Sequence, residues 1–263
     1  MHLNAIDSGA DSPDHLPPLL ILHGLLGSAR NWGAVVKALG EGRRVLALDL
    51  PNHGSSPWTE VMDYPFMARE VAKVIEHLGG RAVVMGHSMG GKAAMVLALT
   101  RPELVERLVV VDIAPVGYTH TFAPYVKAMR GAPLASAHSR AEVEAYLATH
   151  IPDQGVRAFL MQNLEGGAGG YRWRPNLAVL HAHMDDILAF PRVEDGVHYD
   201  GPTLFVAGAT SDYIRPEHED VIAHLFPQSE TVEIPDAGHW VHADNPNGFM
   251  AVIAPFLARD GGR

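Results

Sequence analysis

The fold is decided by the stretch Ala82-Val83-Val84-Met85-Gly86-His87-Ser88-Met89-Gly90, in which an apolar run leads into a serine between two glycines. The apolar run predicts a buried strand, and residues 89–100, rich in Ala, Met and Leu, predict a helix. A sharp turn between the two lifts the Ser88 hydroxyl above the sheet. Such a turn needs Gly at 86 and 90, because a Cβ atom there would clash with the neighbouring chain. The pattern indicates that Ser88 is a nucleophile.

The loop after another apolar run, residues 18–22, is a candidate oxyanion hole. It has the sequence His23-Gly24-Leu25-Leu26-Gly27-Ser28. In a strand–turn–helix nucleophile site, a loop of this kind donates one backbone N–H to the developing oxyanion, and the residue after the nucleophile donates the other. We assign these donors to the backbone N–H groups of Leu25 and Met89. Each such donor lowers the barrier by roughly 3 kcal/mol.

The general base is expected near the end of the chain, because histidine comes last in the chain order of such sites. His239 is the best candidate of the 16 histidines, since it follows the predicted strand 230–234. His242 is the nearby competitor, but it falls where the last predicted helix begins. His87 is adjacent to Ser88, yet neighbours at a tight turn point apart.

Two aspartates at strand ends compete to orient the base. Asp112 ends the apolar run 108–112, and Asp212 follows the run 203–207. The orienting carboxylate must accept the other imidazole N–H and stabilise the imidazolium. Either side chain can reach the histidine loop if its strand lies close enough, so these residues alone leave both open.

Short apolar runs alternate with longer segments of helical period along most of the chain. The runs are continuous instead of alternating in polarity, which predicts strands covered on both faces, as in a parallel sheet. They span residues 18–22, 44–49, 81–85, 108–112, 203–207 and 230–234. Helices are predicted at 65–78, 89–100 and 246–258. This alternation predicts a doubly wound α/β domain.

The segment 115–190 interrupts this alternation. It has helical stretches at 139–149 and 156–164, a glycine-rich connector at 166–170 and no convincing strand. We therefore expect residues 1–114 and 191–263 to form the α/β core, and residues 115–190 to form a helical cap over the carboxyl edge of the sheet. Four aromatic side chains are candidates for a pocket beneath this cap: Tyr118, Phe122, Trp173 and Trp240.

Composition excludes several classes of protein. The net charge is −10 and no run of Lys or Arg forms a basic stripe, so we expect no nucleic-acid partner. The chain has no cysteine, which excludes Cys nucleophiles, thiolate metal sites and disulfides, and fits a reducing cytoplasm. No apolar run approaches the roughly 20 residues of a membrane span, and the start of the chain has no secretory pattern. These features predict a cytoplasmic protein, and none of them indicates an oligomeric state.

Two other constellations define distant alternatives. Gly86 to Lys92 has the glycine and lysine spacing of a phosphate-binding loop, but Ala93 stands where that loop needs Ser or Thr for Mg²⁺. His181, His183 and Asp185 are spaced like the start of a binuclear metal site, but they lie in the helical insert without further His ligands. A nucleotide-binding protein and a metallohydrolase are therefore poor alternatives, and no metal site is expected.

Five stretches together carry a family resemblance: 23–28, 49–56, 86–92, 111–115 and 238–242. They resemble the α/β-hydrolase superfamily, and within it the YbfF-type bacterial esterases and the mammalian abhydrolase domain-containing protein 11. The resemblance covers nearly the whole chain. It implies an α/β-hydrolase fold and a serine esterase that hydrolyses small acyl esters or thioesters without a cofactor. A C–C bond hydrolase or a perhydrolase with the same triad is the alternative.

The resemblance also bears on the orienting acid. Relatives of this branch match Asp112, whereas the position of Asp212 is often not acidic. We therefore prefer Asp112 and keep Asp212 as the second candidate, because its presence departs from the pattern of the branch.

Overall fold

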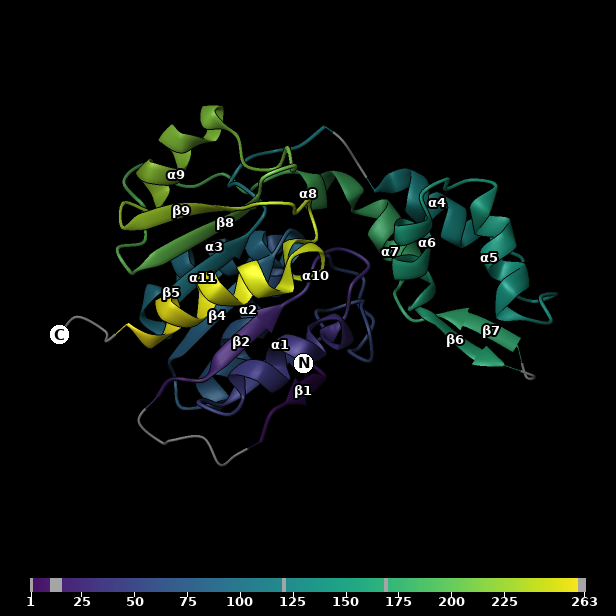
Figure 1. Cartoon of the computed structure of the whole chain (residues 1–263), viewed down its shortest axis with the longest axis horizontal. Coiled ribbons are helices and arrows are strands. Elements are labelled where there is room, and N and C mark those ends of the chain that lie inside the picture. Colours follow the sequence, from purple (N-terminus) through teal and green to yellow (C-terminus); the bar gives the residue numbers. More distant parts are fainter. Residues whose placement is uncertain (1, 10–15, 120–121, 168–169, 260–263) are drawn as a thin grey trace.

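A seven-stranded sheet forms the centre of the protein (Figure 1). The computed structural model describes residues 2–9, 16–119, 122–167 and 170–259. The strand order is β1-β3-β2-β4-β5-β8-β9, with β1 antiparallel to β3 and every other neighbouring pair parallel. The strands are β1 (Ala5–Asp7), β2 (Leu19–Leu22), β3 (Val45–Leu48), β4 (Ala82–His87), β5 (Val105–Val111), β8 (Thr203–Gly208) and β9 (Ser229–Ile234). The mostly parallel sheet that the apolar runs predict is confirmed. The edge strand β1 was not predicted, because three residues are too few to show a pattern.

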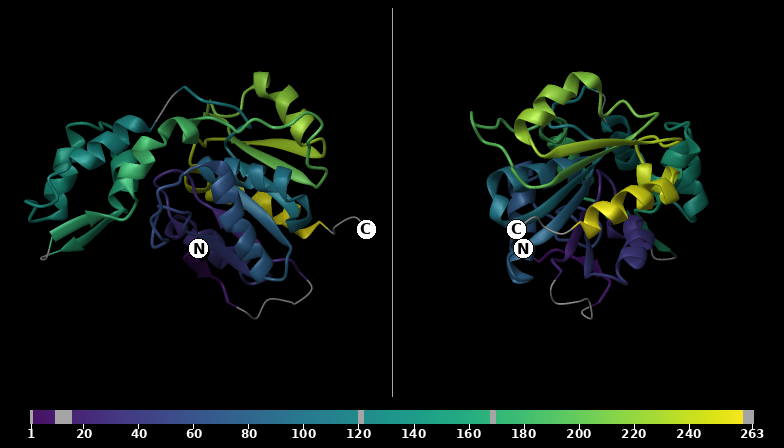
Figure 2. Two further views of the ribbon diagram at one scale, coloured as in Figure 1. Left: turned by 180° about the vertical axis from the view of Figure 1, so that it is seen from behind. Right: turned by 60° about the vertical axis from the view of Figure 1, so that its left-hand side comes forward.

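Helices cover both faces of this sheet (Figure 2), which is why every residue of the inner strands β2, β3, β4 and β8 is buried. In β2, Leu20 and Leu22 belong to the core on one face, and Leu19 and Ile21 belong to the core on the other. The first face packs against α2 (Tyr64–His77), α3 (Met89–Thr100) and α9 (Glu219–Leu225). The second face packs against α1 (Gly33–Leu39) and α11 (Pro246–Ala258). The helices predicted at 89–100 and 246–258 are confirmed at both ends.

The register of the parallel strands brings five loops to one edge. Leu22 lies opposite Gly86, His87 opposite Val111, and Gly208 opposite Ile234. The strands β2, β4, β5, β8 and β9 therefore end at nearly the same level. In open α/β sheets, ligands bind at the carboxyl ends of the strands, so the loops at this edge are where a site is expected.

An insert between β5 and β8 stands beside the sheet (Figure 1). It contains α4 (Ala123–Gly131), α5 (Arg140–Ala148), α6 (Gln154–Met161), β6 (Leu164–Gly167), β7 (Gly170–Trp173), α7 (Leu177–Ala182) and α8 (Met184–Leu188). The expectation that this segment has no strand is wrong, because β6 and β7 pair as an antiparallel hairpin. The glycine-rich run was expected to be a connector, but Gly166 and Gly167 belong to β6 and Gly170 belongs to β7, while residues 168 and 169 lie outside the described residues. Gly166 and Gly170 have φ values of 113° and 107°, a conformation that favours glycine.

The described residues also include the short helical elements η1 (Ala29–Trp32), η2 (Pro102–Leu104), η3 (Pro216–His218) and α10 (Val241–Asp244). None of the helices in the described ranges has the length and apolar character needed to cross a membrane.

Candidate active site

Ser88 lies at the turn between β4 and α3 in a strained backbone conformation. Its φ of 53° and ψ of −119° lie outside the regions that most side chains adopt. The need for glycine on both sides is confirmed. A Cβ on Gly86 would lie 2.2 Å from the carbonyl oxygen of Gly90, and one on Gly90 would lie 2.4 Å from that of Leu22. These close approaches hold Ser88 at the carboxyl edge of the sheet.

His239 lies between the Ser88 hydroxyl and the Asp112 carboxylate. Its Nε2 is 3.0 Å from Ser88 Oγ, and its Nδ1 is 2.8 Å from Asp112 Oδ2. Tyr213 stacks on the imidazole, with the ring centroids 3.8 Å apart. His87 Nε2 donates to the carbonyl oxygen of His239 at 2.7 Å. The imidazole is therefore fixed in the position from which it can remove the serine proton.

The Asp112 carboxylate is fully buried and hydrogen-bonded at both oxygens. Its Oδ1 accepts from the backbone N–H of Gly208 at 3.0 Å, and its Oδ2 also accepts from the Ser211 hydroxyl. These bonds come from the last residue of β8 and from the loop after it, and β8 neighbours β5 in the sheet. The carboxylate is thus held in one orientation towards His239.

Asp212, the competing acid, lies on this same loop but outside the cluster. It is exposed, and its carbonyl oxygen accepts from Arg215 Nε at 2.9 Å. Its neighbours Ser211 and Tyr213 turn inward and contact Asp112 and His239. The sequence analysis singled out this loop because of Asp212, but it did not predict a role for Ser211 or Tyr213. Their position next to Asp212 is the only feature of the sequence that pointed to them.

The loop after β2 is held beside the turn that follows β4. The backbone N–H of Leu26 donates to His53 Nε2 at 3.2 Å, and its carbonyl oxygen accepts from Asn163 Nδ2 at 2.7 Å. Within the described residues, the backbone N–H groups of Leu25 and Met89 donate to no carbonyl outside their own elements. Met89 opens α3, so its N–H has no acceptor within the helix either. Both groups are available to a ligand oxygen.

Four further histidines surround the site, and burial lowers the pKa of each. Desolvation brings the pKa of His53 to about 3 and that of His242 to about 4. It also places the pKa of His23 and of His87 below the ordinary value of 6.5. These rings are therefore neutral at neutral pH, and each has one N–H donor and one acceptor.

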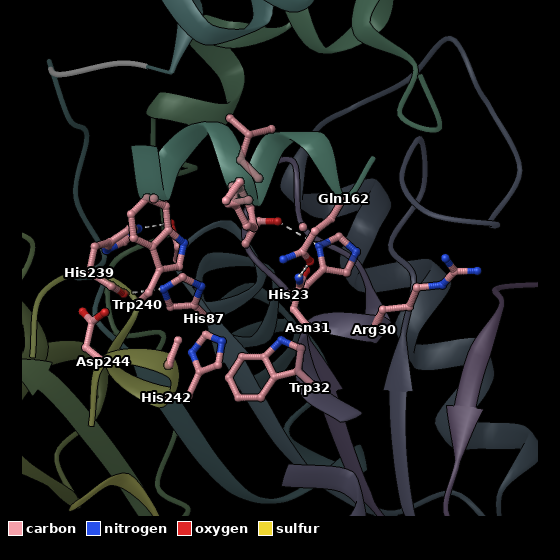
Figure 3. A pocket seen from close by; sticks show the side chains of 18 of the residues that line it. His23, Arg30, Asn31, Trp32, His87, Gln162, His239, Trp240, His242 and Asp244 are labelled. Atoms are coloured by element: carbon pink, nitrogen blue, oxygen red, sulfur yellow. Dashed lines mark hydrogen bonds between the residues drawn. The ribbon is translucent and has the colours of Figure 1, made fainter. Parts of the chain in front are cut away.

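Two cavities within the described part of the chain open at Ser88. The large cavity, of about 590 Å³, is drawn in Figure 3, with His239 and Trp240 on one side and Asn31 and Gln162 on the other. Other residues that line it include His23, Arg30, Trp32, His87, Phe122, Phe159 and His242. The small cavity has about 30 Å³. It is lined by Leu25, Tyr64, Ser88, Met89, Lys92, Ile113, Tyr118, Phe122, Ile187, Leu188 and Tyr213.

Three of the four aromatic residues predicted to line a pocket do line one of these two cavities. Trp240 lines the large cavity, Tyr118 lines the small one, and Phe122 lines both. Trp173 lines neither of them. It packs inside the insert, where its Nε1 donates to the carbonyl oxygen of Met129 at 2.7 Å.

Residues that suggested a phosphate-binding loop or a metal site make other contacts in the structure. Lys92 is buried on α3, and its Nζ donates to the carbonyl oxygens of Leu188 and Ala189, both at 2.8 Å. His183 is 2.9 Å from Asp186 Oδ2 through Nδ1, and its Nε2 is 3.1 Å from the carbonyl oxygen of residue 60. Among the residues that the structure describes, no three His, Asp or Glu side chains are grouped to hold a metal ion.

Comparison with known proteins places this chain in a family. Residues 17–246 match the family model described as alpha/beta hydrolase fold, and the chain belongs to that family. It is 42% identical to the sn-1-specific diacylglycerol lipase ABHD11 of Mus musculus, over 94% of this chain and 83% of that protein. It is 32% identical to esterase YbfF of Escherichia coli, over 98% of this chain and 99% of that protein.

A solved structure agrees with these relatives. A marine microorganism esterase superposes with a TM-score of 0.90 at 33% identity, covering 97% of this chain and 98% of that one. The predicted α/β-hydrolase fold and the predicted family are thereby confirmed. With relatives named esterase or lipase, the chain is a carboxylic ester hydrolase, as the sequence predicted.

Proposed function

We propose that this chain is a serine esterase in which Ser88 attacks the acyl carbonyl and becomes acylated. The observation that carries the proposal is the hydrogen-bonded line of Ser88 Oγ, His239 and Asp112, with distances of 3.0 and 2.8 Å. His239 removes the hydroxyl proton while the bond between Oγ and carbon forms, and Asp112 stabilises the resulting imidazolium. The backbone N–H groups of Leu25 and Met89 donate to the oxyanion.

The same groups complete the reaction. When the tetrahedral intermediate collapses, the bond to the leaving group breaks and His239 gives its proton to the leaving oxygen or sulfur. A water molecule then attacks the acyl-enzyme, and His239 takes one of its protons. The second intermediate releases the carboxylic acid and restores the Ser88 hydroxyl. Side chains and backbone amides supply every step, so the proposal requires no cofactor and no metal.

The proposed substrates are small acyl esters, with thioesters as a second leaving-group class. The named relatives are esterases and a diacylglycerol lipase, which supports ester cleavage. C–C bond hydrolases and perhydrolases use the same three side chains, but none of the relatives described above carries such a name. We expect no nucleic-acid partner, because the net charge is −10 and basic residues form no stripe.

The insert of residues 115–190 is proposed to be a cap over the site. Phe122, Phe159 and Gln162 come from it and line the large cavity. Asn31 Nδ2, in the core, donates to Gln162 Oε1 at 2.7 Å, which ties the insert to the rim of the site. A cap in this position excludes water from the reacting atoms.

A cytoplasmic location is also part of the proposal. It is supported by the absence of cysteine from the sequence, since disulfides have no place in a reducing compartment. Cell fractionation with an antibody to the chain tests it.

A fluorophosphonate probe tests the proposed nucleophile. We expect the probe to label the wild type and not Ser88→Ala, because only an activated serine reacts with it. Hydrolysis of p-nitrophenyl acetate should fall in the same variant by about 10⁴-fold or more. Ser136→Ala is the matched control, since this serine is exposed on the insert and should be labelled like the wild type. Equal labelling of Ser88→Ala and the wild type would refute the assignment.

A further inference from the structure

The two cavities that meet at Ser88 differ in whether His239 forms part of the wall, and this difference indicates which part of a substrate each cavity can hold. His239 lines the large cavity and is absent from the walls of the small one. The two cavities share Leu25, Ser88 and Phe122, so a carbonyl bonded to Ser88 Oγ has one cavity on each side. Its two remaining substituents, the acyl chain and the leaving group, must therefore point in different directions.

Proton transfer determines which substituent takes which side. The leaving oxygen or sulfur must come within hydrogen-bond reach of His239 Nε2, because this group supplies the proton on departure. The leaving group therefore lies on the side of His239. We propose that the large cavity holds the leaving group, that the small cavity holds the acyl chain, and that the enzyme prefers short acyl groups on bulky alcohols or thiols. This inference rests on the proposed function.

The far wall of the small cavity is braced by hydrogen bonds, so it resists expansion. Tyr64 Oη donates to the carbonyl oxygen of Ile187 at 2.5 Å, and Lys92 Nζ donates to that of Leu188 at 2.8 Å. The Tyr118 hydroxyl donates to the carbonyl oxygen of Tyr213 at 2.5 Å. These bonds tie α2 and α3 to the C-terminal end of the insert, and the N-terminal end of the insert to the loop after β8. A longer acyl chain would have to break them.

The volumes set the expected size of each substituent. The small cavity has about 30 Å³, which is room for about two groups of the size of a water molecule. It accommodates one or two carbon atoms beyond the carbonyl, an acetyl or propionyl group. The large cavity, at about 590 Å³, falls within the range of pockets that enclose drug-sized ligands. Its aromatic walls, Trp32, Phe159 and Trp240, suit an apolar body of that size.

Two substrate series separate the two cavities. In the first, p-nitrophenyl acetate, butyrate and octanoate vary the acyl chain with a constant leaving group. In the second, methyl, hexyl and 2-naphthylmethyl acetate vary the size of the leaving group with a constant acyl chain, and all three leaving groups are alkoxides of similar basicity. For the wild type we expect kcat/KM to fall at least tenfold from acetate to octanoate and to rise from methyl to 2-naphthylmethyl acetate. A misfitting methylene changes kcat/KM by about 10- to 200-fold, so these effects are measurable.

Two matched variants test which cavity contacts the acyl chain and which contacts the leaving group. Ile187 lines only the small cavity and Phe159 only the large one. Ile187→Ala should raise the butyrate-to-acetate ratio of kcat/KM about tenfold and leave the leaving-group order unchanged. Phe159→Ala should weaken the preference for 2-naphthylmethyl acetate and leave the acyl order unchanged. Ile187→Val removes a single methyl group and provides the same comparison if the alanine variant does not fold.

The possible results discriminate between the inference and the proposed function. If Ile187→Ala changes the leaving-group order and Phe159→Ala the acyl order, the assignment of the cavities is reversed. A wild type that prefers octanoate likewise overturns the short-acyl preference. In either case an acetyl adduct on Ser88, detected by mass spectrometry after rapid quenching, leaves the esterase mechanism standing. Undiminished hydrolysis by Ser88→Ala would instead remove the proposed function.

Discussion

At the scale of single residues, the site depends on the side chain of Asp112. A fully buried carboxylate is costly unless hydrogen bonds compensate for its lost solvation. Here it accepts from the Gly208 backbone, the Ser211 hydroxyl and His239 Nδ1. The bond to His239 fixes the proton on Nδ1 and leaves Nε2 as the acceptor that faces Ser88. The orientation of Asp112 therefore sets the tautomer of His239, the proposed base.

Exchange of the carboxylate for an amide tests this dependence. In Asp112→Asn the amide can donate to Nδ1 and favour the wrong imidazole tautomer, so we expect kcat to fall by about 10⁴-fold. Asp212→Asn is the matched control, and its kcat should stay within a few-fold of the wild type because this side chain is exposed. Steady-state hydrolysis of p-nitrophenyl acetate measures both. A loss in Asp212→Asn as large as that in Asp112→Asn would contradict the assignment.

At the scale of elements, the turn from β4 to α3 is the tightest connection described above. The carbonyl oxygen of Leu22 in β2 occupies the space that a side chain at position 90 would need. Gly86 likewise faces the backbone of the first turn of α3. Close contact between a strand and the start of a helix is what raises Ser88 to the edge of the sheet.

Alanine at position 90 should therefore distort the turn from β4 to α3 and displace Ser88. Gly90→Ala places a Cβ 2.4 Å from a backbone oxygen, and we expect it to lower the free energy of unfolding by about 3 kcal/mol and to abolish fluorophosphonate labelling. Gly33→Ala is the control, since its φ is −54° and a Cβ there meets no atom within 4 Å. This variant should gain about 0.5 kcal/mol of stability. Urea unfolding measures both, and equal stabilities would contradict the steric argument.

At the scale of the whole molecule, buried neutral histidines connect loops from distant parts of the chain. His242 stacks on Trp32 with ring centroids 4.0 Å apart, and burial lowers the pKa of its ring to about 4. Its Nδ1 has no hydrogen-bond partner among the described residues. His53 accepts from the backbone of Leu26 and has a pKa lowered to about 3. Folding therefore keeps rings neutral that the unfolded chain protonates at mildly acidic pH.

These shifts predict loss of stability in acid. The folded pKa of His242 lies below its unfolded value of 6.5, so the unfolded state binds more protons between pH 6.5 and about 4. Stability then falls as pH falls through this window, by about 1.4 kcal/mol per pH unit for each such histidine. His242→Phe removes one of them, so between about pH 7.5 and about pH 5 the wild type should lose about 2 kcal/mol more than the variant. Urea unfolding at the two pH values measures the difference, and equal losses would show that His242 titrates normally in the folded state.

The sequence by itself determined the alternation of strands and helices and the sharp turn at Ser88. It also pointed to His239, because the histidine of such a site comes last along the chain. The alternation and the turn are encoded locally, because the period of apolar residues and the space around two glycines depend on a few neighbouring positions. The same locality explains the errors. The edge strand β1 is too short to show a period, and glycines at 166, 167 and 170 give no sign that these positions belong to the paired strands β6 and β7.

Only the tertiary structure decided which of the two aspartates contacts His239 and how large each cavity is. Asp112 and Ser88 contact His239 across 127 and 151 positions of the chain, so the contact depends on the order of β4, β5, β8 and β9 in the sheet. Asp112 and Asp212 both follow strands, and the direction of each side chain separates them. Cavity volume is likewise set by side chains from several elements that pack against one another, which no single stretch of sequence specifies.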